Sequence, residues 1–185
     1  MKTQNLLLVL TSALLLTGCF STKFYVLSTA SEPSVSYAQT NMSIGVEKIT
    51  VPEYLFKRDI AVAETSSQIR LLSNATWGED LDAGLTQRLI AFLQKKFNQP
   101  NVYPYPWGLD NLPTKAVTVQ VSRFIAQGDK VYLDANWKVR NIKTNTTKAR
   151  LFSTTIPTKS NASDIVSAMD KAFGELEEAV ARGVR

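Results

Sequence analysis

Two features of the composition limit the chemistry available to this 185-residue chain: it has no histidine, and it has one cysteine, Cys19. Without histidine there is no imidazole general base, no histidine metal ligand and no histidine-containing triad. A single cysteine forms no internal disulfide, and a cysteine nucleophile normally needs a basic partner such as histidine. The sequence therefore argues against nucleophilic catalysis at Cys19 and leaves its thiol for another chemistry.

Two acidic clusters are the remaining candidates for catalytic or metal chemistry. They are Glu79, Asp80 and Asp82, and Glu175, Glu177 and Glu178. Side chains one and three positions apart on a helix do not all converge, so the first cluster is interpreted as the acidic start of a helix. The second is interpreted as a solvated helix face. The chain also lacks a Gly-Lys-Ser/Thr phosphate loop and a dinucleotide fingerprint. We therefore expect a protein without catalytic activity, metal or cofactor. The remaining enzymatic alternative is a membrane-anchored hydrolase with a Ser–Lys site, which needs no histidine.

The segment in front of Cys19 has the zones of a secretion signal. Lys2 supplies a positive start, and Leu6–Leu16 is an apolar run of 11 residues interrupted only by Thr11 and Ser12. A membrane-spanning helix needs about 20 residues, whereas the core of a signal peptide has about 7–15. Residues 1–18 are therefore predicted to be a cleaved signal peptide.

The sequence Leu16-Thr17-Gly18-Cys19 resembles the bacterial lipobox. The resemblance implies that the Cys19 thiol receives a diacylglyceryl group, that the chain is cut before Cys19, and that the new amino end is acylated. Two or more acyl chains anchor a protein stably. Phe20 follows the cysteine where inner-membrane lipoproteins usually have aspartate, so the resemblance implies the periplasmic face of the outer membrane. The alternative is an ordinary signal peptide next to a buried cysteine.

The remaining chain has the composition of one globular domain. Apolar residues make up 44% and charged residues 20%, which is typical of a folded protein. The net charge of +5 is spread along the sequence rather than gathered in a stripe, which argues against a nucleic-acid partner. We expect a lipid-anchored tether over residues 19–23 and a single domain over residues 24–185.

Hydrophobic periodicity predicts short strands, one strong hairpin and two helices. The predicted strands lie at 24–27, 43–51, 59–64, 68–72, 117–124, 131–139 and 149–156. Gly128 and Asp129 supply the hairpin turn. A helix is predicted after Thr76, with Thr76 and Glu79 as a capping box, and a second from about Asn161 to Arg182. These elements predict an α/β (α+β) sandwich in which two amphipathic helices cover a mixed sheet of about five to six strands.

Aromatic residues outside the regular elements, together with the neighbouring Leu55, are the candidates for contacting a partner. They form two groups: Tyr54, Leu55 and Phe56, and Tyr103, Tyr105 and Trp107. The second group lies in a proline-rich connection, residues 100–113, which is predicted to be irregular. Trp77 and Trp137 are instead predicted to belong to the core.

The order of these segments resembles a known family, the ABC-type transport auxiliary lipoproteins of the PqiC-like group. The resemblance is carried by residues 25–27, 44–46, 51–55, 59–62, 77–81, 117–124 and 131–137, and by the closing helix. Gly78 follows Trp77 where the family usually has alanine or a similar residue. The resemblance implies a non-catalytic partner of an MCE-domain periplasmic protein with its permease and ATPase.

In that family the lipoprotein is expected to dock the MCE assembly at the outer membrane, as a homo-oligomer, in a system that moves lipid between membranes. A second reading is a lipoprotein that regulates or activates a cell-wall synthase or another envelope-assembly machine. Such a protein would need a long linker to cross the peptidoglycan. Only a few residues separate Cys19 from the first predicted strand, which favours the transport role.

Overall fold

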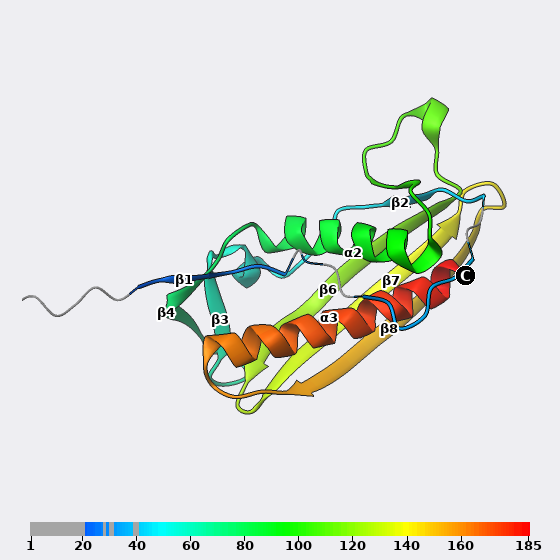
Figure 1. Cartoon of the computed structure of the whole chain (residues 1–185). Helices are drawn as coiled ribbons and strands as arrows, with labels where there is room; N and C mark the ends of the chain where they lie inside the picture. The colour runs from blue at the N-terminus through cyan, green and yellow to red at the C-terminus, as the bar shows by residue number, and fades with distance from the viewer. Residues whose placement is uncertain (1–20, 28, 30–31, 39–40) are drawn as a thin grey trace, which may run out of the picture.

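The computed structural model describes residues 21–27, 29, 32–38 and 41–185, so the predicted signal peptide and Cys19 lie outside the described residues. The elements in chain order are β1 (Lys23–Tyr25), β2 (Ile44–Val46), η2 (Glu53–Phe56), β3 (Asp59–Ala63), β4 (Ile69–Trp77), α2 (Leu81–Phe97), β5 (Val102–Pro104), η3 (Leu109–Asn111), β6 (Lys115–Gln127), β7 (Lys130–Asn141), β8 (Thr146–Pro157) and α3 (Ala162–Val184). Figure 1 shows the sheet with both helices on the same face.

The sheet has eight strands and is built around β6. One side of β6 pairs antiparallel with β7, which pairs antiparallel with β8. The other side pairs in parallel with two short strands: β2 lies against the start of β6 and β3 against its end. β4 and β1 extend the sheet beyond β3, and β5 extends it beyond β2. β8 is therefore a long edge strand, paired on one side only within the described sheet.

β6 and β7 form the predicted antiparallel hairpin, in which apolar and polar side chains alternate between the two faces of the sheet. Val117, Val119 and Val121 are buried under the helices, while Gln120 and Ser122 are exposed on the other face. Gly128 has a φ of 60° and so provides the left-handed backbone of the turn. A register shift between Val121 and Arg123 restores the inward direction at Phe124.

The two helices bury their apolar stripes on this one face. In α3, Ile165, Met169, Phe173, Leu176 and Val180 are each 2% exposed or less, and burial of each such side chain contributes roughly 1.5–3 kcal/mol. The opposite face of the sheet carries mainly polar side chains such as Gln120 and Asn136, together with the 89%-exposed Leu151, and neither α2 nor α3 covers it. The fold is therefore a two-layer α+β domain, which confirms the predicted class.

The sheet is larger than the predicted five to six strands. β5 lies in the connection that was predicted to be irregular, and its three residues pair with β2, which is far away in the sequence. A strand this short has no periodicity of its own. Its existence depends on a long-range pairing that pattern analysis cannot see.

The predicted capping box at Thr76 is wrong. Thr76 belongs to β4, where its hydroxyl donates to Asp59 at 3.2 Å, and α2 begins only at Leu81. Tertiary pairing with β3 extends the strand past the position where the local sequence favours a helix. The second helix does have a side-chain cap, because the Asn161 side chain accepts the Asp164 backbone N–H at 2.9 Å.

Candidate partner-binding surfaces

The distal loop, residues 105–114, projects from the body of the domain between β5 and β6 (Figure 1). Its base is fixed by the Tyr105 backbone N–H, which donates to the Val46 carbonyl at 2.8 Å. Trp107 packs over Gly45, where an added Cβ would lie 2.6 Å from the indole ring. Gly45 is therefore required for the close approach of the ring to the strand.

The structure brings together the three aromatic residues predicted in this region. The rings of Tyr105 and Trp107 meet edge to face at 5.0 Å between centroids. The Tyr103 hydroxyl donates to the Asn111 carbonyl at 3.1 Å. Trp107 and Tyr103 are half-buried and support the loop, whereas Tyr105 is 60% exposed. Tyr105, together with Leu112 at 49% exposed, forms the accessible apolar surface of this loop.

The second predicted group lies on η2 and divides into three different environments. Leu55 is 3% exposed and belongs to the hydrophobic core, so its side chain is not part of the surface. Tyr54 is half-buried, and its hydroxyl accepts the Phe124 backbone N–H at 3.1 Å. Burial of the phenol raises the pKa of Tyr54. The hydrogen bond from the Phe124 N–H and the positive charge of Arg123 lower this pKa, but by less than burial raises it. Phe56 is 58% exposed.

The two groups do not form one surface. Both groups can be located along β6. Gly45, which lies under Trp107, pairs with Ala116 of β6, whereas the Tyr54 hydroxyl accepts the backbone N–H of Phe124. Ala116 and Phe124 are eight positions apart on β6, which corresponds to about 26 Å along a strand. A single small partner cannot use both groups as one contact.

A buried charge cluster joins the two helices, and sequence analysis missed it. Arg88 of α2 and Glu177 of α3 both have 0% exposed side chains, with Nε and Oε1 at 3.1 Å. Arg88 also bonds to the carboxylate and the backbone carbonyl of Asp170. Burial lowers the pKa of Arg88, but the carboxylates of Glu177 and Asp170 outweigh this effect and raise it overall. The guanidinium is therefore held charged between the helices.

This cluster corrects the prediction that Glu175, Glu177 and Glu178 form a solvated face. Glu177 is buried, Glu178 pairs with the 3%-exposed Lys96 at 2.8 Å, and Glu175 is the exposed member of the three. The missed signal was periodicity. Glu177 lies four positions after Phe173 and three before Val180, so it belongs to the buried stripe of α3.

The first acidic cluster does not converge on a site. Asp82 pairs with Lys48 at 2.6 Å, and Asp80 pairs with Arg58 at 3.3 Å. Within the described residues, no group of acidic and cysteine side chains is arranged to hold a metal ion. In the same part of the chain, no helix is both long and apolar enough to cross a membrane.

Taken together, the fold is a small two-layer α+β domain whose buried ion pairs join its helices. The sequence model of one family, the ABC-type transport auxiliary lipoprotein component, matches residues 25–181. The chain belongs to this family. Membership confirms the predicted resemblance and makes the chain an auxiliary lipoprotein component of ABC-type transport.

Solved structures with low sequence identity share the fold. An uncharacterised protein has a TM-score of 0.74 at 20% identity, over 89% of this chain and 99% of its own. A Xanthomonas campestris protein of the DUF330 family has a TM-score of 0.73 at 14% identity, over 86% of this chain and 92% of its own. No protein of curated function matches the chain.

Proposed function

We propose that this protein is the outer-membrane lipoprotein subunit of an MCE-type lipid transport system and docks the periplasmic MCE assembly, without catalysis of its own. The observation that carries the proposal is the arrangement of the domain along its long axis. β1 lies at one end, and the distal loop lies at the other (Figure 1). An anchor attached at Cys19 would therefore hold one end at the membrane and present the other to the periplasm.

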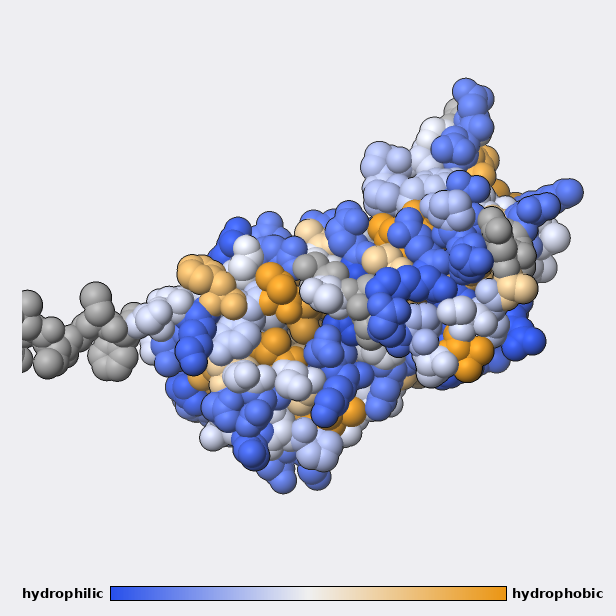
Figure 2. All heavy atoms as spheres, in the orientation of Figure 1, coloured by the Kyte–Doolittle hydropathy of each residue, from blue (hydrophilic) through white to orange (hydrophobic). Residues whose placement is uncertain are grey.

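The short tether supports this orientation. Only three residues lie between Cys19 and Lys23, where β1 begins, and the four steps span at most about 14 Å when extended. Apolar side chains are exposed beside this point, with Phe24 at 71% and Val26 at 50%. Figure 2 shows apolar residues near the end where the chain enters the domain. Such side chains suit the membrane interface.

The opposite end offers surfaces for protein contact. Tyr105 and Leu112 on the distal loop are aromatic and aliphatic groups of the kind that form the centre of an interface. Along the side of the domain, the 12-residue edge strand β8 has no strand partner on its outer side within the described sheet, and such edges pair with other chains. We assign the distal loop to the MCE partner and the β8 edge to a second copy in a homo-oligomer.

In-cell photocrosslinking tests the docking role. A photoreactive phenylalanine analogue at Tyr105 is expected to crosslink the MCE protein of the same envelope. The variant Tyr105→Ser with Leu112→Ser is expected to recover at least tenfold less MCE protein in a pull-down of the intact lipoprotein. Val35→Ser is the matched control, because Val35 is also exposed, at 62%, but lies in the N-terminal segment.

Mass spectrometry of the same preparation tests the anchor. The expected product begins at Cys19 and carries a diacylglyceryl group and an N-acyl chain. Recovery of neither an MCE protein nor a homo-oligomer from an acylated sample would refute the docking role. Capture of a penicillin-binding protein instead would favour the activator of a cell-wall synthase.

A further inference from the structure

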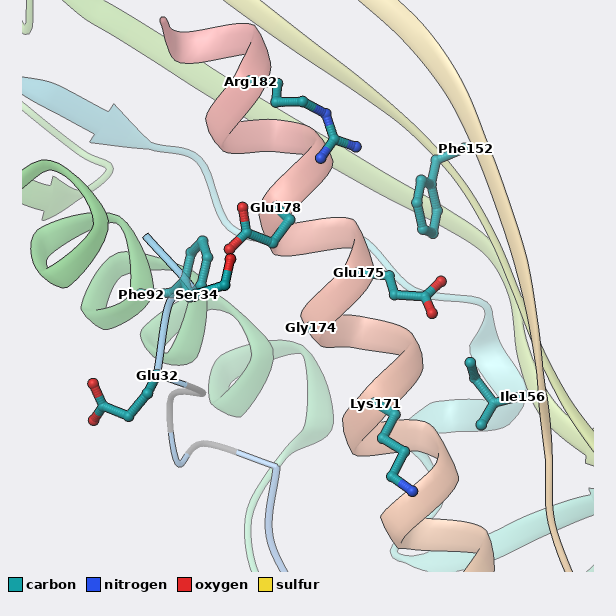
Figure 3. Close-up of a pocket in the computed structure, with 10 residues that line it drawn as sticks. All are labelled: Glu32, Ser34, Phe92, Phe152, Ile156, Lys171, Gly174, Glu175, Glu178 and Arg182. Carbon is teal, nitrogen blue, oxygen red and sulfur yellow. The ribbon is translucent and has the colours of Figure 1, made fainter. Parts of the chain in front are cut away.

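Two hollows lie next to each other between α3 and the edge strand β8, and together they are named the α3–β8 groove. Figure 3 shows the larger one, of about 660 Å³, in which Phe152 and Ile156 of β8 lie opposite Glu175 of α3. The smaller one, of about 480 Å³, lies toward the carboxyl end of α3 and shares Phe152 and Arg182 with the first. Both volumes lie in the range of small-molecule sites, roughly 300–1,000 Å³.

The end of the groove toward the carboxyl end of α3 is cationic. Lys148 and Arg150 line it from β8, and Arg182 lines it from α3. None of these three side chains forms an ion pair with a carboxylate among the described residues. Lys115 lies close by, and its pKa is lowered by burial and by the charge of Lys148. Within the part of the chain that the structure describes, no ion pair therefore neutralises the positive charge at this end.

The carboxylates that line the larger hollow are already engaged. Glu178 pairs with Lys96 at 2.8 Å, and Glu32 pairs with Lys95 at 2.5 Å. The Glu175 carboxylate accepts a hydrogen bond from the Thr154 hydroxyl at 2.5 Å. The rest of the wall near β8 is apolar, with Phe152 and Ile156 half-buried against the core. The larger hollow therefore has an apolar wall on the β8 side, Phe152 and Ile156, and a charged wall on the α3 side that includes Lys171, Glu175 and Glu178.

We infer that the α3–β8 groove binds one anionic phospholipid molecule, with the phosphate between Lys148, Arg150 and Arg182. Arginine guanidinium groups bind phosphate oxygens in pairs. The start of one acyl chain then lies against Phe152 and Ile156. An acidic peptide would satisfy the cations but would leave the apolar hollow unused, so the lipid fits both halves. The inference goes beyond docking, which requires no ligand in this groove.

Native mass spectrometry of the mature protein in a neutral detergent tests this binding. Phosphatidylglycerol and phosphatidylcholine with the same acyl chains are titrated separately. One phosphatidylglycerol per chain is expected to remain bound, at least fivefold more tightly than phosphatidylcholine. Arg150→Glu with Arg182→Glu is expected to weaken its retention at least tenfold. Lys143→Glu with Lys159→Glu makes the same change in net charge away from the groove, and its retention is expected to equal that of the wild type.

A second variant and a head-group competitor separate the two halves of the site. Phe152→Ser is expected to weaken phosphatidylglycerol retention at least threefold while circular dichroism stays unchanged. Inorganic phosphate at the concentration of the lipid is expected to displace little of it. Equal retention of both lipids, equal losses in both charge variants, or full displacement by phosphate would overturn the inference. Co-purification of an acidic peptide in place of lipid would also overturn it. None of these outcomes depends on an MCE partner, so this inference and the docking role fail independently.

Discussion

At the residue scale, the Arg88–Glu177 pair shows how charge is tolerated inside this domain. Both side chains are fully buried, and the guanidinium has further bonds to Asp170. Removal of two charged groups from water costs several kcal/mol per ion. Their mutual attraction offsets this cost only when the ion pair is well aligned and the remaining polar atoms are also hydrogen-bonded. The pair is therefore weak evidence for net stability, but the loss of one partner leaves a buried charge without its counterion.

Glu177→Gln is expected to lower the free energy of unfolding by about 3 kcal/mol, at the lower end of the usual range because Asp170 remains. Urea denaturation measures this loss. Glu175→Gln, on the exposed side of the same helix, is the control and should stay within about 0.5 kcal/mol of the wild type. Arg88→Met combined with Glu177→Leu should recover most of the stability. Equal stability of Glu177→Gln and Glu175→Gln would show that the buried pair is not closed as described.

Lys115 gives a pH dependence whose sign follows from its surroundings. Burial and the charge of Lys148 lower the pKa of Lys115 below its ordinary 10.5. The folded state thus disfavours the ammonium form, so stability from this group is present above the unfolded pKa and is lost as the pH falls through the folded pKa.

Lys148→Gln is expected to raise the pKa of Lys115, observed by NMR titration of its ε-methylene group. Lys148→Gln should therefore be more stable than the wild type, and by more at pH 7, where Lys115 is charged, than at pH 11. The control Lys159→Gln should show no such gain in stability.

At the element scale, the distal loop depends on one strand residue without a side chain. Gly45 of β2 lies under Trp107 and Pro113, and an added Cβ would lie 2.6 and 2.7 Å from them. Neither group is a flexible chain end, so the loop has to move. Gly108, within the loop, has open space around it and an ordinary φ of −71°. The two glycines are therefore a matched pair, with one constrained by packing and one free.

Gly45→Ala is expected to destabilise the protein by about 1–3 kcal/mol, the usual cost of overpacking. It should also shift the NMR signal of the Trp107 indole N–H. Gly108→Ala should stay within about 0.5 kcal/mol of the wild type and leave that signal in place. A shift of the indole signal in Gly108→Ala but not in Gly45→Ala would contradict the described packing of the loop.

Long periodic elements were predictable from the sequence, and short ones were not. The β6–β7 hairpin and α3 each carry many repeats of one period, so their type follows from local pattern. β5 and the extension of β4 to Trp77 depend on pairing with distant strands, which no local window contains. For the candidate site, the aromatic residues of the distal loop were found by their type. Glu177 was misassigned because its charge was weighted above its position in the buried stripe.

At the scale of the whole molecule, the long strands set the distance between the two ends. β6 has 13 residues, which span about 40 Å. β1 and its partner β4 lie at one end, while the distal loop and the β7–β8 turn lie at the other (Figure 1). Because the tether is short, the proposed anchor fixes which end faces the membrane. Asn74, beside the β1 contact, and Lys143, in the β7–β8 turn, are both exposed and report on the two ends.

Energy transfer to a membrane-surface acceptor measures this orientation. A fluorophore on an introduced cysteine is placed either at Asn74→Cys or at Lys143→Cys, in the acylated protein reconstituted into vesicles with head-group-labelled lipid. Since acylation consumes the Cys19 thiol, only the new cysteine reacts. Transfer is expected to be efficient from position 74 and weak from position 143, because the two ends differ in height by several tens of ångströms. Equal transfer from both positions would mean that the domain lies flat on the membrane, with the distal loop directed along the bilayer rather than toward a periplasmic partner.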